Sequence, residues 1–308
     1  MDIQSKFFNK NGISLHYYEI ENDLTPLVMI HAQGVDGLNF ENTFKKLSNK
    51  YHIYSIDCYG HGKSLHDSSK YNLMDISSAV MEFVIDVVKR KTYLLGHSSG
   101  GLIAACTAAR ADVCERLILE DPPFFSCQGD RRFNAYNYVD LSTVCHNFLQ
   151  QDTETDFVSY YFQNQYMWNF FPEKVREKAR KKLSENVKKQ REKNPDGELK
   201  VTGFPKNALA GFKGMNNYDP KFGEAFYTNS FNEGVRHSDM LKRIKCPTVF
   251  FKATTDQSAD GLLLAALSED DLARVCQLVD DCEVIRFNSG HAIHIEKEKE
   301  FVQAMLGL

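Results

Sequence analysis

The chain has 308 residues, of which 43% are hydrophobic and 12% aromatic, enough apolar material for one large globular core or for a core with a substantial insertion. The 41 acidic and 37 basic residues leave a formal net charge of -4, which gives no overall attraction to nucleic acid or to an anionic membrane. The N-terminus has no hydrophobic leader and the apolar runs are too short to span a bilayer. We therefore expect a cytoplasmic protein that binds neither nucleic acid nor membrane.

The first part of the chain predicts a parallel sheet that opens with a hairpin. Alternating polar and apolar residues flank Asn11-Gly12, a pair that favours a tight turn with positive φ. Short β-rich runs then alternate with stretches of helical spacing, and these runs are PLVMIHA at 26–32, YHIYSID at 51–57, TYLLG at 92–96 and RLILED at 116–121. Because strands that alternate with helices form parallel sheets, the fold class is α/β.

The alternation stops near Pro122-Pro123 and resumes at IKCPTVFFKATTD (244–256), which precedes a helix and a last strand, EVIRFNSGH. The intervening segment contains clustered aromatic residues and a lysine-rich stretch of helical periodicity. We predict a core formed by residues 1–123 and 237–308, with residues 124–236 inserted as a helical cap. The clustered aromatics could line a pocket or form the core of the cap itself. The basic stretch is interspersed with acids, which is typical of a solvated helix face.

Two serines lie side by side between glycines in LLGHSSGG (94–101). A sharp turn from a strand into a helix leaves no room for side chains beside a nucleophile, and the pattern G-x-S-x-G is centred on Ser98. The frame centred on Ser99 would begin with His97, so Ser98 is the candidate nucleophile. The backbone N–H of Ser99 would then lie at a helix N-terminus, where it can stabilise an oxyanion. A glycine-rich turn that only packs, or that binds phosphate, is the alternative interpretation.

A second candidate donor follows the strand PLVMIHA, where the backbone N–H of Gln33 could reach the same cavity. At this point the chain resembles the α/β-hydrolase family of serine hydrolases. The resemblance rests on three motifs. His31-Ala32-Gln33-Gly34 is similar to the family's His-Gly oxyanion loop, with Ala32 in place of the usual glycine. The turn from Asp57 to Ser64 is similar to D-x-x-G-x-G-x-S, and the Gly96 to Gly100 segment is similar to the family's elbow. The resemblance continues through CPTVFFKATTD and NSGHAIHIEK and covers about two-thirds of the chain.

In this family the nucleophile is followed in the chain by an acid and then by a histidine. The resemblance therefore implies a catalytic triad of Ser98, Asp256 and His291, with Gln33 and Ser99 as the oxyanion donors. Asp256 follows the strand PTVFFK and His291 follows the strand EVIRF, and the carboxyl ends of parallel strands meet at one edge of the sheet.

Other acids and histidines compete for the same roles. Asp121 ends another strand, RLILED, and is the rival acid, while Asp260 is a remoter choice. His294 lies one helical turn beyond His291 and is the rival base. His97 and His61 are interpreted as structural.

The resemblance implies acyl transfer that needs no cofactor and no metal. His291 would take the proton of Ser98 as the hydroxyl attacks a carbonyl, and water would later resolve the acyl-enzyme. We expect a hydrolase of small apolar esters or lactones. A C–C bond hydrolase, a hydroxynitrile-type lyase and a slow-turnover ligand receptor use the same residues and stay open, as does a homodimer. A serine at position 98 argues against dehalogenases and epoxide hydrolases, which carry aspartate there.

Overall fold

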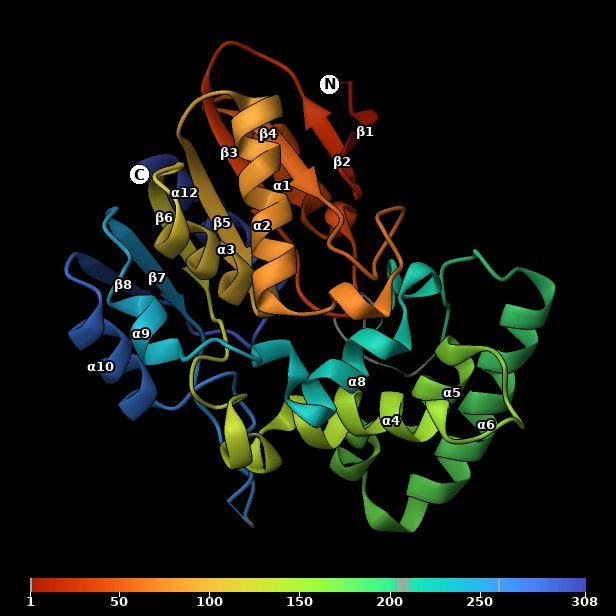
Figure 1. The fold of residues 1–308 in the computed structure, drawn as a ribbon. Helices are drawn as coiled ribbons and strands as arrows, with labels where there is room; N and C mark the ends of the chain where they lie inside the picture. The colour runs from red at the N-terminus through yellow and green to blue at the C-terminus, as the bar shows by residue number, and fades with distance from the viewer. Residues whose placement is uncertain (1, 203, 205–208, 210, 260) are drawn as a thin grey trace.

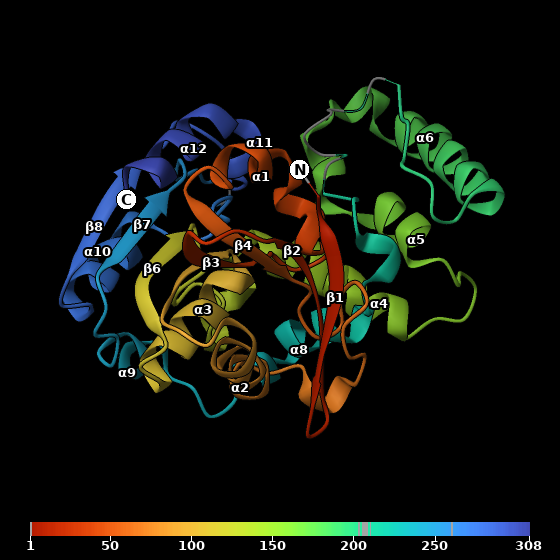
Figure 2. The same ribbon diagram turned by 90° about the horizontal axis from the view of Figure 1, so that it is seen from above.

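The computed structural model describes residues 2–202, 204, 209, 211–259 and 261–308. Its centre is an eight-stranded sheet in the order β1-β2-β4-β3-β5-β6-β7-β8 (Figures 1 and 2). The strands are β1 (Gln4–Lys10), β2 (Ile13–Ile20), β3 (Thr25–Ile30), β4 (Tyr51–Ile56), β5 (Thr92–His97), β6 (Cys114–Glu120), β7 (Thr248–Lys252) and β8 (Cys282–Arg286). β1 and β2 pair antiparallel, β2 pairs antiparallel with β4, and the remaining neighbours are parallel. The prediction of a mostly parallel α/β sheet with an antiparallel hairpin is confirmed.

The hairpin turn has the backbone that its sequence predicts. Asn11 has a φ of 47° and Gly12 a φ of 83°, the left-handed conformations that a two-residue turn between twisted strands requires. Asn and Gly tolerate these angles better than other residues.

Helices cover both faces of the sheet (Figure 2). One face is covered by α1 (Glu41–Leu47), α11 (Ile293–Glu296) and α12 (Glu298–Gly307). The other face is covered by α2 (Leu73–Phe83), α3 (Ser99–Arg110), α9 (His237–Leu241) and α10 (Glu269–Leu278). Each central strand therefore has apolar residues on both sides, and β3, β4 and β5 are almost completely buried.

Between β6 and β7 the described residues form helices rather than strands, and these lie beside the carboxyl ends of the strands (Figure 1). They include α4 (Thr143–Leu149), α5 (Phe157–Asn164), α6 (Glu173–Lys193) and α8 (Pro220–Thr228). α8 packs on α4, α4 on α5 and α5 on α6, whereas α9 packs on α3 of the core. These contacts fit the predicted segment 124–236, and its role as a cap stays a prediction.

Some aromatic residues of this segment pack against one another, and others line a cavity. Phe162 and Trp168 pack with Phe204 and form a small apolar core of the segment itself. Tyr161 and Phe170 instead line a cavity. In α6 only Ser184, Val187 and Arg191 are buried, so the basic stretch is largely a solvated face, as its sequence indicates.

No helix in the part of the chain that the structure describes is both long and apolar enough to cross a membrane.

Candidate active site

The turn between β5 and α3 forces Ser98 into an unusual conformation. Its φ of 56° and ψ of -121° lie in a region that residues with side chains rarely adopt, and such strain is concentrated at functional sites. The flanking glycines make the turn possible. A Cβ on Gly96 would overlap the backbone of Gly100, and a Cβ on Gly100 would overlap the carbonyl group of Ile30 at the end of β3. Ser98 is therefore held at the carboxyl edge of the sheet by backbone packed on backbone.

The loop after β3 is fixed by two buried histidines. The His31 Nδ1 donates to the carbonyl oxygen of Ala32 at 2.7 Å, and its Nε2 accepts from the N–H of Cys58 at 2.9 Å. Since the C=O and N–H of a trans peptide point to opposite sides, this bond directs the N–H of Gln33 away from His31. His61 accepts the N–H of Gly34 on its Nε2 at 3.1 Å.

The turn that begins at Asp57 supports the same loop. The buried Asp57 carboxylate accepts from the N–H of Gly37 at 2.8 Å and of Lys63 at 3.0 Å, and it pairs with His16 at 2.7 Å. A Cβ on Gly62 would overlap this carboxylate. The turn therefore fixes His61, which this arrangement makes a structural residue of the oxyanion loop.

The acid that reaches His291 is Asp121 and not Asp256. The His291 Nδ1 lies 2.8 Å from Asp121 Oδ2, and the Asp121 side chain is fully buried, whereas that of His291 is 41% exposed. Asp256 is exposed, and its carboxylate accepts from the N–H of the next residue, Gln257. The prediction that Asp256 supports His291 is thus corrected by the geometry. Asp260 lies outside the described residues.

A buried lysine lies beside Asp121, the residue that follows β6. Lys252, the last residue of β7, lies next to Asp121, with its Nζ 3.5 Å from Oδ1 of the carboxylate and both side chains fully buried. The N–H of Ala253 also approaches Oδ1, at 3.3 Å. Lys252 donates to the Ala253 carbonyl as well, at 2.5 Å. The carboxylate of Asp121 is thereby surrounded by donors, which is the environment that a buried charge needs.

The rival base His294 belongs to a buried layer of polar side chains formed by His97, Glu120 and His294. Its Nδ1 lies 2.8 Å from Glu120 and its Nε2 lies 2.8 Å from Asn39, so both ring nitrogens have partners within the protein. Burial raises the pKa of Glu120, but the nearby His294 and His97 more than offset this and lower it to about 2.

His97 belongs to the same layer. It donates from Nε2 to the carbonyl of His291 at 3.1 Å, and its ring lies 4.8 Å from the His291 ring. Nitrogen and oxygen atoms of His97, Glu120 and His294 lie within 4.8 Å of one another, a spacing also found among metal ligands, but these hydrogen bonds already engage Glu120 and His294. Burial lowers the pKa of His97 to about 3, so its ring is neutral near pH 7. His97 thus packs against His291, and His294 packs against His97. Neither His97 nor His294 lines the cavity.

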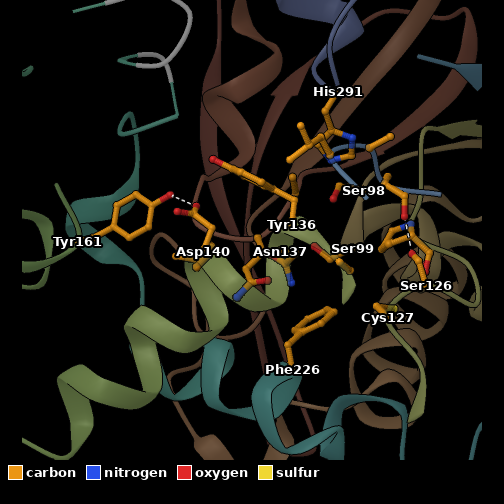
Figure 3. Close-up of a pocket in the computed structure, with 18 of the residues that line it drawn as sticks. Ser98, Ser99, Ser126, Cys127, Tyr136, Asn137, Asp140, Tyr161, Phe226 and His291 are labelled. Atoms are coloured by element: carbon orange, nitrogen blue, oxygen red, sulfur yellow. Dashed lines mark hydrogen bonds between the residues drawn. The ribbon is translucent and has the colours of Figure 1, made fainter. Parts of the chain in front are cut away.

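A cavity of about 340 Å³ opens beside Ser98 and His291 (Figure 3). Gln33 and Ser99 also line it, so the two predicted oxyanion donors and the predicted nucleophile, Ser98, share one space. The opposite wall comes from the inserted segment and from the loop after β7, through residues that include Tyr136, Asn137, Asp140, Leu141, Tyr161, Phe170, Phe226, Leu264, Ala265 and Ala266. The volume lies at the small end of ordinary ligand pockets.

Several of these wall residues carry no specific signal in the sequence. Asp140 is flanked by apolar and small residues without any motif, and Leu264 to Ala266 belong to an apolar run that reads equally well as core. The sequence did indicate Asp121 as the rival acid, because it follows the run RLILE. In the parallel sheet Glu120, the last residue of β6, aligns with Phe251, so Asp121 follows β6 at the level where Lys252 ends β7.

Residues 27–304 match the alpha/beta hydrolase family. The chain belongs to this family, which confirms the resemblance seen in the motifs. A stretch of 114 residues is 30% identical to the pimeloyl-[acyl-carrier protein] methyl ester esterase of Aliivibrio fischeri (strain MJ11) and covers 36% of this chain and 42% of that protein. The chain thus aligns with about two-fifths of the length of such curated relatives.

Two solved structures share the whole architecture of this α/β hydrolase. A hydrolase from Pseudomonas aeruginosa PA01 superposes with a TM-score of 0.68 at 17% identity, over 99% of this chain and 98% of the other. The enol-lactonase from Burkholderia xenovorans LB400 superposes with a TM-score of 0.65 at 17% identity, over 98% of each chain. At this identity the likeness establishes the fold.

The close approach of the elbow to β3 gives a first prediction. Gly100→Ala should prevent the native turn, because its Cβ would meet the backbone of Ile30, which cannot move without breaking the sheet. We expect a loss of folding free energy of about 3 kcal/mol or more, or failure to fold. Chemical denaturation measures this, and Gly307→Ala is the control because nothing lies within 4 Å of the added Cβ. Equal stabilities of the two variants would contradict the packing described.

Buried neutral histidines predict that stability falls in acid. The pKa of His97 is lowered from 6.5 to about 3 by burial, so an unfolded chain takes up a proton at this site that the folded chain refuses between those pH values. Unfolding is therefore favoured as the pH falls, by about 1.4 kcal/mol per pH unit for this residue. In His97→Gln the slope of unfolding free energy against pH between 6 and 4 should decrease by about that amount. An unchanged slope would show that the folded state protonates His97.

Proposed function

We propose that the protein is a serine hydrolase that cleaves a small carboxylic ester or lactone through an acyl-enzyme on Ser98. The observation that carries the proposal is the 2.8 Å contact between His291 and the buried Asp121, with His291 and the strained Ser98 on the wall of one cavity. A serine hydroxyl needs a nearby base, and the base needs an acid that fixes its tautomer. The names of the esterase and lactonase relatives agree with chemistry at an ester carbonyl.

The proposed reaction assigns one role to each group. Asp121 accepts the Nδ1–H of His291, which leaves the lone pair of Nε2 free to take the proton from the Ser98 hydroxyl. The Ser98 oxygen attacks the carbonyl carbon, and the N–H groups of Gln33 and Ser99 stabilise the resulting oxyanion. His291 then gives the proton to the departing alkoxide.

Water completes the cycle by the same groups in reverse. His291 takes a proton from the water as it attacks the acyl carbonyl, a second oxyanion forms in the same place, and the Ser98 oxygen leaves with the proton. The products are a carboxylic acid and an alcohol, or one hydroxy acid when the substrate is a lactone.

The nucleophile is tested by intact-protein mass after incubation with a fluorophosphonate. Wild type should gain one adduct and hydrolyse p-nitrophenyl esters of short chains, while Ser98→Ala should do neither. Ser99→Ala distinguishes the adjacent serines, because it keeps the backbone N–H and should still be labelled. The absence of both adduct and turnover in wild type would refute the hydrolase proposal and favour a ligand receptor.

The acid is tested by comparing two aspartates. Asp121→Asn should lower kcat on a p-nitrophenyl ester by about 10³- to 10⁴-fold, because an amide cannot fix the tautomer or stabilise the imidazolium. Asp256→Asn should retain activity near that of wild type, since the Asp256 side chain is exposed and bonds to Gln257. The reverse order of the two losses would restore Asp256 as the acid.

A further inference from the structure

Asp140 is a buried carboxylate on the cavity wall for which the proposed reaction has no use. It is 4% exposed and belongs to a π-helical segment, Tyr138–Ser142, that leads into α4. Single π-helical turns inside helices are frequent at functional sites. Figure 3 shows Asp140 and Tyr161 at the end of the pocket away from Ser98 and His291, with Tyr136 and Asn137 between them.

No positively charged side chain among the described residues balances the charge of Asp140. Its Oδ2 accepts from the Tyr161 hydroxyl at 2.6 Å and its Oδ1 accepts from the N–H of Tyr166 at 2.5 Å. Among the described residues no lysine, arginine or histidine forms an ion pair with it. A carboxylate has about four acceptor positions, so these two bonds leave capacity for further donors.

Burial raises the pKa of Asp140 to about 6, and the bonds from Tyr161 and Tyr166 oppose that rise. The group is therefore mostly ionised at pH 7. A buried, ionised carboxylate without a cation costs folding free energy, so a cationic ligand that reaches Asp140 would be favoured.

The neighbouring wall is aromatic. Tyr136, Tyr161, Phe170 and Phe226 line the same cavity, and the Tyr136 and Phe170 rings are stacked with their centroids 6.5 Å apart. The faces of aromatic rings attract cations, and a carboxylate among such rings is the usual chemistry of an ammonium site. An anionic group would meet the Asp140 charge, and the described residues that line the cavity include no lysine or arginine, so an anion is disfavoured at this end.

We propose that Asp140 and its aromatic neighbours bind a protonated amine, so that the preferred substrate is an ester that carries an ammonium group several bonds from its scissile carbonyl. This inference rests on the proposed function, because it places the carbonyl at Ser98. It makes Asp140 a specificity-determining residue for that site.

The test compares two esters of the same shape, methyl 6-aminohexanoate and methyl heptanoate, which differ by an ammonium group in place of a methyl group. Wild type should prefer the amino ester in kcat/KM by about 10- to 100-fold. In Asp140→Asn, which keeps hydrogen-bonding capacity and removes the charge, the ratio should fall to about one or reverse. Asp152→Asn, an exposed aspartate of the same inserted segment, is the matched control and should keep the wild-type ratio.

A second pair of esters locates the amine. 2-Aminoethyl acetate and propyl acetate place the ammonium group on the alcohol side instead. A preference in either series that depends on Asp140 supports the proposal and shows which side of the carbonyl faces the inserted segment. No preference in either series, or a preference that survives in Asp140→Asn, overturns it and leaves Asp140 as a structural tie between Tyr161 and Tyr166.

Calorimetric titration of Ser98→Ala with the first pair separates this inference from the hydrolase proposal, since it requires no turnover. Tighter binding of methyl 6-aminohexanoate than of methyl heptanoate, lost on adding Asp140→Asn, supports the ammonium site even if wild type hydrolyses neither ester. The second pair is titrated in the same way, and equal binding within both pairs contradicts the proposal even if wild type hydrolyses all four esters.

Discussion

The candidate site depends on one close approach, that of the β5–α3 turn to the end of β3. Only a position without a side chain allows Gly100 to lie against the Ile30 carbonyl, and this contact fixes where Ser98 stands relative to the loop that follows β3. Since Gln33 belongs to that loop and Ser99 begins α3, the candidate nucleophile and both candidate oxyanion donors are placed by the same backbone contact. The strain at Ser98 is offset by the pairing of the strands on either side.

A buried layer of charge supports the other half of the site. Asp121, Lys252 and Glu120 are all fully buried at the carboxyl ends of β6 and β7, and each is held by hydrogen bonds or an ion pair. Burying one such charged group alone costs folding free energy, and an opposite charge beside it offsets part of this cost. Glu120 holds His294 and Asp121 holds His291, so two adjacent residues at the end of β6 orient one histidine in the loop after β8 and one in α11. The uncharged His97 fills the space between them, where a further positive charge would compete for the same carboxylates.

The inserted segment contributes a wall of different character. The sheet edge presents the candidate reactive groups, while the residues between β6 and β7 present aromatic rings and the Asp140 carboxylate, which pairs with no cation among the described residues. The fold can keep the first set constant and vary the second, because loops and insertions at a sheet edge change without disturbing the core. Asp140 is held by Tyr161 and Tyr166 from the same segment, so this end of the cavity is built independently of Ser98 and His291.

The sequence by itself determined the local features of the site. The glycine pattern around Ser98, the turn at Asn11-Gly12 and the alternation of strands and helices depend on neighbours in the chain, and the structure has each of them. Only the tertiary structure decided which acid meets His291. Asp121 and Asp256 both follow parallel strands, and the choice depends on the path of the loop after β7 and on the buried Lys252 beside Asp121. Asp140 could not be predicted from the sequence for the same reason. Its burial and its place in the cavity arise from contacts between segments that are distant in the chain.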